Sequence, residues 1–118
     1  MNTDITYVII DTMNYELSSY ALERSQQRFP VENILIFSDI ANNWSDRDVV
    51  LIPEIQSLED YNRIVFFELP KHLKTSHALM LQYDGYVLSG DRFSENFLLY
   101  DYIGAPWPHY QSHKVGNG

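Results

Sequence analysis

Short apolar runs alternate with longer amphipathic segments along the chain. The apolar runs are rich in β-branched residues and are typical of strands buried on both faces of a sheet. They cover residues 5–10, 33–37, 49–52 and 78–83. Residues 86–88 are expected to be extended, and residues 94–100 to form one or two helical turns.

Two segments between these runs are predicted to be helices. Residues 14–28 lack glycine and proline, so they favour a helix that begins at an Asn14 N-cap and ends before Pro30. Its expected inner face is Leu17, Tyr20 and Ala21.

The second helix is predicted to begin at Ser57, with Asp60 in the capping-box position. Its apolar residues recur at helical spacing up to Leu69, and Pro70 is expected to end or kink it there.

The order strand, helix, strand, strand, helix, strand predicts an α/β fold with a mainly parallel sheet. Ligands bind such sheets at the carboxyl ends of the strands. Polar pairs follow three of the expected strands: Asp11–Thr12, Ser38–Asp39 and Asp84–Gly85. This edge of the sheet is therefore the predicted ligand site.

The composition fits one domain of 118 residues with a hydrophobic core. With a formal charge of −8, the chain lacks the basic surface by which proteins bind duplex DNA or RNA. The absence of cysteine removes disulfides, thiol nucleophiles and cysteine metal sites. No apolar run approaches the ~20 residues of a transmembrane helix, and no basic leader precedes one, so a cytoplasmic location is expected.

Two charged residues are open to a functional and a structural interpretation. Asp84 can hold a divalent cation with Gly85 giving a ligand access to the backbone, but Asp-Gly is also a common turn. Arg63 can meet a phosphate, but it can also pair with Glu59 on the helix surface. For both residues the local sequence favours the structural role.

Other motifs narrow the classes of enzyme. Trp107, in a Gly-Ala-Pro-Trp-Pro loop, suits either a stacking site for a sugar or base or a hydrophobic plug. The chain has no Gly-x-Gly-x-x-Gly motif, Walker loop or Gly-x-Ser-x-Gly elbow. Dinucleotide-dependent dehydrogenases, P-loop NTPases and α/β-hydrolases therefore lose most of their support.

Three stretches together resemble a family of poorly characterised, glycosyltransferase-like domains found in bacteria and eukaryotes. They read DYNR at 60–63, ALMLQYDGYVL at 78–88 and YDYIGAPW at 100–107, followed by VGNG at 115–118. The resemblance runs from about Ser57 to the last residue, and the YDYIGAPW stretch is its most specific part. In the family the chain continues into a further glycine and a Ser-Leu-Arg segment. We therefore expect residues 1–118 to be a single, incomplete domain.

The resemblance implies a Rossmann-like αβα sandwich, the amino-terminal part of a GT-A-type glycosyltransferase fold that binds a nucleotide-sugar. Asp84 would stand where such enzymes place an Asp-x-Asp motif that binds Mn²⁺ or Mg²⁺, although the second Asp is absent here. The implied donor-binding residues are Thr12, Asn62, Arg63, Asp84 and Gly85. The implied acceptor-side residues are Trp107, Gly116, Asn117 and Gly118.

The expected function is therefore the donor-binding part of a protein that transfers a sugar from a UDP- or GDP-linked donor. Its acceptor is unknown, and a cell-surface glycan is one candidate. Asp84 would act in catalysis by orienting the cation or the donor. The alternatives are a non-catalytic nucleotide- or carbohydrate-binding module and an inactive fragment.

Overall fold

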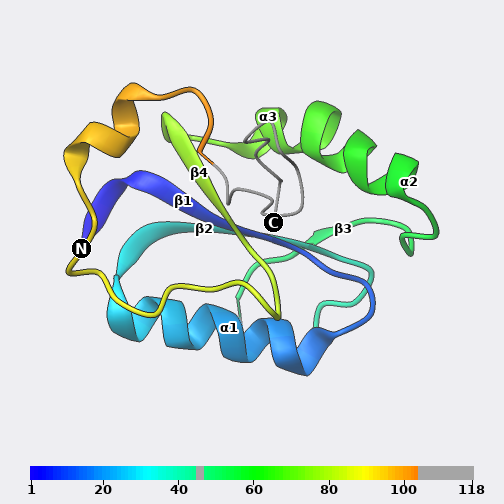
Figure 1. Ribbon diagram of the computed structural model, residues 1–118. Coiled ribbons are helices and arrows are strands. Elements are labelled where there is room, and N and C mark those ends of the chain that lie inside the picture. The colour runs from blue at the N-terminus through cyan, green and yellow to red at the C-terminus, as the bar shows by residue number, and fades with distance from the viewer. Residues whose placement is uncertain (45–46, 104–118) are drawn as a thin grey trace, which may run out of the picture.

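The computed structural model describes residues 1–44 and 47–103, which form a sheet between two helical layers (Figure 1). The strands are β1 (Asn2–Ile10), β2 (Val31–Ser38), β3 (Val50–Leu51) and β4 (His77–Leu81). The helices are α1 (Tyr15–Arg28), α2 (Leu58–Arg63), the π-helical turn η1 (Ile64–Glu68), α3 (Leu69–His72) and the 3₁₀ helix η2 (Glu95–Leu99). The predicted order of strands and helices is confirmed.

The four strands are all parallel and lie in the order β3-β2-β1-β4. The chain moves from β1 outward through β2 to β3, and then returns to place β4 on the other side of β1. The connections from β1 to β2 and from β3 to β4 thus run in opposite directions across the sheet. The strand order reverses between the paired strands β1 and β4. Open α/β sheets bind ligands at the carboxyl ends of the strands on either side of such a switch point.

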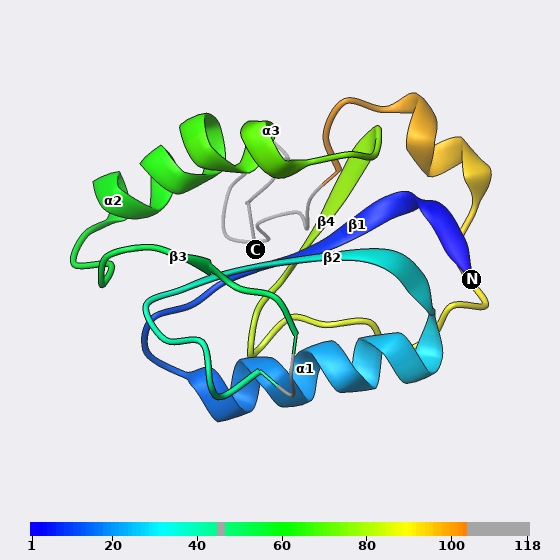
Figure 2. The same cartoon turned by 180° about the vertical axis from the view of Figure 1, so that it is seen from behind.

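The two faces of the sheet carry separate hydrophobic cores. Helix α1 covers one face, and α2, η1 and α3 cover the other (Figures 1 and 2). Successive residues of β1 alternate between the two cores: Tyr7 and Ile9 pack on the α1 side, and Val8 on the α2 side. Both faces are covered, which explains why the strands read as almost continuous apolar runs.

The inner face of α1 is only partly the one that the apolar spacing predicts, because Ala21 is buried as expected but Leu17 and Tyr20 are not. Leu17 and Tyr20 are more than half exposed, and the buried residues of the helix are Ser18, Ala21, Leu22 and Ser25. Small residues face the sheet because the ring of Tyr7 fills this space, with its hydroxyl donating to the carbonyl oxygens of Ser25 and Phe29. Burial of this phenol raises the pKa of Tyr7 to about 12.

The second helical layer begins as predicted but does not stop at Pro70. The Ser57 hydroxyl accepts from the Asp60 amide at 3.1 Å, and the Asp60 carboxylate accepts from the Gln56 amide at 3.0 Å. The helix then continues through Pro70 to His72. The widened turn η1 lies directly before the proline, where a regular i→i−4 bond would need the amide hydrogen that proline lacks.

Candidate functional site

An open cavity of about 230 Å³ lies at the switch point of the sheet. It is formed by the carboxyl ends of β1 and β4 and by the first two turns of α1. The lining residues are Ile10, Asp11, Asn14, Ser18, Leu81, Gln82 and Tyr83. The cavity thus lies at the edge where the sequence predicts a ligand, and we call it the switch-point cavity.

Asp11 is the one carboxylate that lines this cavity, and its oxygens are already in use. Oδ1 accepts from the amides of Met13 and Asn14, each at 2.7 Å, and Oδ2 accepts from the Ser18 hydroxyl. The carboxylate therefore holds the turn that leads into α1, close to a helix amino end where negative charge is favoured. Asn14 holds the N-cap position as predicted, but its side chain makes no capping hydrogen bond.

Tyr15 links the carboxyl ends of β1 and β2 beside the cavity. Its hydroxyl donates to Asp39 Oδ1 at 2.8 Å, and the Thr12 carbonyl oxygen lies 2.9 Å away as a second acceptor. The hydrogen bond to Asp39, with burial and the nearby carboxylates, raises the pKa of Tyr15 to about 12. The phenol is therefore neutral at physiological pH and acts as a donor.

Thr12 is buried and belongs to the other face of this edge. Its Oγ1 accepts from the Ile55 amide at 3.0 Å, so it anchors the loop between β3 and α2. On the same face, Tyr61 of α2 reaches the side chain of Gln82 at the end of β4. Burial raises the pKa of Tyr61, and the hydrogen bond from Gln82 opposes that rise. Thr12 does not line the switch-point cavity.

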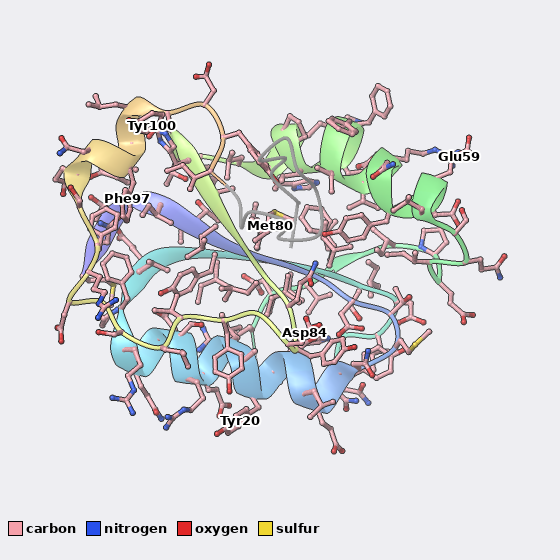
Figure 3. All side chains as sticks on the ribbon, viewed as in Figure 1. Tyr20, Glu59, Met80, Asp84, Phe97 and Tyr100 are labelled. Atoms are coloured by element: carbon pink, nitrogen blue, oxygen red, sulfur yellow. The ribbon has the colours of Figure 1, made fainter. Side chains whose placement is uncertain are left out.

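Asp84 and Gly85 lie directly beyond the cavity, in a tight turn that follows β4. The Gln82 amide donates to the Gly85 carbonyl oxygen at 2.9 Å, and the Gly85 amide donates to the Gln82 carbonyl oxygen at 3.1 Å. Tyr83 and Asp84 occupy the centre of this turn, which lies over α1 (Figure 3). The structural interpretation of Asp-Gly as a turn is thus confirmed.

The side chains of this turn are also open to a ligand. Asp84 is exposed and makes no hydrogen bond or ion pair within residues 1–44 and 47–103. A Cβ placed on Gly85 would have no atom within 4 Å. A free carboxylate and an unobstructed backbone therefore directly follow Tyr83, which lines the cavity, although neither Asp84 nor Gly85 lines it.

Asn62 and Arg63 are not brought to the cavity. They lie at the end of α2, on the face of the sheet opposite α1 (Figure 1), and neither lines the cavity. Arg63 is exposed, and the predicted surface pair with Glu59 is not formed. The expected acceptor-side residues Trp107, Gly116, Asn117 and Gly118 lie outside the described residues.

A metal site made by the protein alone is absent from the part of the chain that the structure describes. No three histidine, aspartate or glutamate side chains gather there in a way that could hold an ion. The Asp11 oxygens are occupied and Asp39 Oδ1 accepts from Tyr15, whereas Asp84, in the turn beside the cavity, has no hydrogen bond among the described residues and is the freest carboxylate for a cation. Mg²⁺ commonly binds through one or two carboxylates together with substrate phosphates and water. The residues present fit that kind of site and not an all-protein cage.

Three residues of the site were not singled out by the sequence. Asn14, Ser18 and Tyr83 line the cavity, although nothing in their spacing marks them as ligand-binding residues. Ser18 and Tyr83 become neighbours of the site only because β4 returns beside β1. Asp11, by contrast, could be predicted as a site residue from the sequence, because it is the polar residue that directly follows the first strand.

Comparison with known proteins places the chain in a family without assigning its function. No helix within residues 1–44 and 47–103 has the length and hydropathy needed to span a membrane. No curated protein matches the chain, and no solved structure matches it. Residues 48–118, more than half of the chain, match the model of a protein family of unknown function, DUF5672. This segment includes β4 and the Asp84 turn, and the chain belongs to that family.

Proposed function

We propose that the chain is the nucleotide-sugar donor-binding part of a glycosyltransferase-like protein. The donor would be a UDP- or GDP-linked sugar, and the full-length protein would transfer the sugar to a glycan or another acceptor. The observation that carries the proposal is the switch-point cavity at the carboxyl ends of β1 and β4, with Asp84 and Gly85 in the turn that directly follows its lining residue Tyr83.

The position of the cavity supports a nucleotide ligand for a physical reason. Parallel α/β sheets place helix amino ends and strand carboxyl ends at one edge, so backbone donors and polar side chains converge there. The cavity of about 230 Å³ accommodates part of a nucleotide, and the rest of the donor would lie across the open turn. Asn14 and Tyr83 offer an amide and a phenol to that ligand, while the Ser18 hydroxyl is engaged by Asp11.

A divalent cation, Mn²⁺ or Mg²⁺, belongs to this proposal as a joint ligand of Asp84 and the donor diphosphate. The chain's charge of −8 makes unaided binding of a diphosphate unfavourable. A cation would supply the electrostatic stabilisation that a leaving diphosphate requires. Asp84 would hold and orient the cation, and Gly85 would let the phosphates approach the backbone.

A non-catalytic binding module is the second candidate, and one observation favours it. The carboxylate that lines the cavity, Asp11, is committed to three hydrogen bonds with the start of α1. Among the described residues, the carboxylate inside the cavity is therefore not free to act as a base, and Asp84 lies in the adjoining turn rather than in the cavity lining. In this reading the chain binds a nucleotide or carbohydrate without transferring a sugar.

Calorimetric titration of the chain with UDP and GDP, each with and without Mn²⁺, tests the proposal. We expect Mn²⁺-dependent binding of one nucleotide, and its loss in Asp84→Ala. Asp91→Ala is the matched control, because Asp91 is also an exposed loop carboxylate but lies away from the cavity.

The outcomes separate the two candidates. Failure of a folded chain to bind either nucleotide contradicts the donor-site proposal, as does binding that Asp84→Ala retains in full. Incubation with UDP- and GDP-sugars then measures release of the nucleoside diphosphate. Binding without release favours the non-catalytic module.

A further inference from the structure

A second cavity, of about 260 Å³, lies on the face of the sheet that α2 and α3 cover (Figure 2). Its floor is formed by β1 and β2, and its rim by the start of β3 and the end of α3. It shares no lining residue with the switch-point cavity, which lies beside α1. We call this space the α3 cavity.

Two polar residues lie side by side on the floor of the α3 cavity. Thr6 of β1 and Asn33 of β2 are register partners, and both line the cavity. The next pair on the same face, Val8 and Leu35, is apolar and packs in the core. A polar pair on a covered face needs polar partners, because an unpaired buried polar group costs free energy. The cavity is the place where a ligand can supply such partners.

The hydrogen bonds of Thr6 determine what its hydroxyl offers to a ligand. Thr75 Oγ1 donates to the His77 carbonyl oxygen at 2.8 Å, and the Thr6 and Thr75 hydroxyl oxygens lie 2.6 Å apart. Since the Thr75 proton is already used, Thr6 donates to Thr75 and keeps its own lone pairs. Thr6 is only 1% exposed, so the floor holds a buried acceptor that suits a hydrogen-bond donor of the ligand.

Two further side chains of the cavity offer both donors and acceptors. Neither the Asn33 amide nor the His72 imidazole makes a hydrogen bond within residues 1–44 and 47–103. The His72 ring lies edge-on to Phe37, with 5.7 Å between the ring centroids. An amide has donors and an acceptor, and a neutral imidazole has one of each. The α3 cavity therefore presents a mixed set of hydrogen-bonding groups.

The rim of the cavity carries one acidic and one basic side chain. Asp48 lies shortly before β3 and Lys74 follows α3, and both are exposed. They form no ion pair with each other or with another residue of the described chain. Their charges balance, so an anion would be opposed by Asp48 and a cation by Lys74. The charges therefore favour a ligand without net charge.

We propose that the α3 cavity binds a neutral polyhydroxylated ligand, a single pyranose unit. Each hydroxyl group of such a ring is both a donor and an acceptor, which matches the mixed lining of the cavity. The apolar CH groups of the ring would lie against Leu35 and Val50. The volume of 260 Å³ equals that of about nine water molecules at roughly 30 Å³ each, which is enough for one hexose but not for a nucleotide.

This second site does not depend on the proposed nucleotide site. The two cavities share no residue and lie on opposite faces of the sheet. Binding of a sugar in the α3 cavity can therefore be measured whether or not the chain binds UDP or GDP.

An NMR titration of the full chain with glucose, galactose, mannose and N-acetylglucosamine tests the proposal. We expect saturable amide shifts at Thr6, Asn33 and residues 72–75 with at least one of these sugars. Raising the salt from about 0.1 M to about 1 M should leave the affinity unchanged, because the ligand has no net charge to be screened. A disaccharide that ends in the same sugar distinguishes two sources: comparable binding indicates the end of a glycan, and much weaker binding indicates a free sugar.

Variants of Asn33 test the floor of the cavity. Asn33→Leu should weaken sugar binding by about tenfold, the effect of losing hydrogen bonds to an uncharged group. Asn33→Ala removes the amide without adding bulk and should have a similar effect. Asn96→Leu is the matched control, because Asn96 is exposed and lines neither cavity. It should bind as the unmodified chain does, and circular dichroism verifies that each variant is folded.

Three results would overturn the proposal. The first is a folded chain whose amides do not shift with any of the four sugars. The second is sugar binding that both Asn33 variants retain in full. The third is a response of the same amides to glycine or inorganic phosphate but to none of the sugars, which would assign the α3 cavity to a charged ligand.

Discussion

The hydrogen bonds of Asp11 make its substitution the sharpest test of how the site is held. Asp11→Ala removes a carboxylate that is only 9% exposed and accepts three hydrogen bonds. Two of its donors are backbone amides of the turn before α1, and the third is the buried Ser18 hydroxyl. The substitution therefore frees the turn that leads into α1 and leaves Ser18 without its acceptor.

The expected loss of stability follows from these contacts. Losing the hydrogen bonds that order the turn before α1 costs about 1 kcal/mol, and losing a hydrogen bond from a buried hydroxyl to a charged acceptor costs about 1.5–3 kcal/mol. We expect Asp11→Ala to lower the free energy of unfolding by about 3 kcal/mol. Asp11→Asn keeps an oxygen acceptor but loses the charge at the helix amino end, so we expect a loss of about 1 kcal/mol.

Urea denaturation followed by circular dichroism measures these losses. Asp4→Ala is the control, because Asp4 is an exposed carboxylate at the other end of β1, and its effect should stay within about 0.5 kcal/mol. If Asp11→Ala folds poorly, the loss in free energy of unfolding is measured on Asp11→Asn instead. The reasoning is refuted if Asp11→Ala costs no more than Asp4→Ala.

Two further predictions concern packing and ionisation. A Cβ at Gly90 would lie 2.7 Å from the Arg28 carbonyl oxygen, so Gly90→Ala should lower the free energy of unfolding by about 1–3 kcal/mol; Gly85→Ala, with open space around it, should have a much smaller effect in the same urea assay. The folded pKa values of Tyr7 and Tyr15 are raised from 10.0 to about 12, so the folded state holds these protons more tightly. Their contribution to stability is complete below pH 10 and should be lost as the pH rises through 12, and Tyr7→Phe and Tyr15→Phe should each flatten that decline in alkaline unfolding curves.

The sequence predicted the strands well because each is buried on both faces. Apolar runs such as residues 5–10 are readily assigned as strands rather than helices when they alternate with helical segments. The order of the elements then restricts the sheet to few topologies, and the polar residues that end the strands mark its ligand edge. For this reason the sequence predicted that Asp11 and Asp84 lie at the ligand-binding edge of the sheet.

The inner face of α1 was predicted only in part: Ala21 is buried as expected, but the hydrophobic pattern is misleading for Leu17 and Tyr20. Leu17 and Tyr20 have the expected spacing, but Ser18 and Ser25 face the sheet. Those serines are buried because their polar atoms find partners: Ser18 donates to Asp11, and the Ser25 hydroxyl accepts from the Val87 amide at 3.0 Å. These partners come from other parts of the chain, so spacing within the helix cannot indicate them.

The course of the second helical layer was also only partly predictable from the sequence. Pro70 correctly marks an irregularity, but a π-turn absorbs it and the helix continues for a further turn to His72. A single missing amide hydrogen is compatible with several local solutions, and packing of Ile64 and Leu69 against the sheet selects this one. The exposure of Phe66 and Phe67 follows from that selection.

The central claim is that the switch-point cavity binds the nucleotide of a sugar donor, and amide chemical-shift mapping by NMR tests it most directly. On addition of the nucleotide that binds, with Mg²⁺ as the diamagnetic cation, the largest shifts should fall on Asn14, Ser18 and residues 82–85. The account is contradicted if these amides do not move, or if the largest shifts fall on α3 or on the outer side of α2.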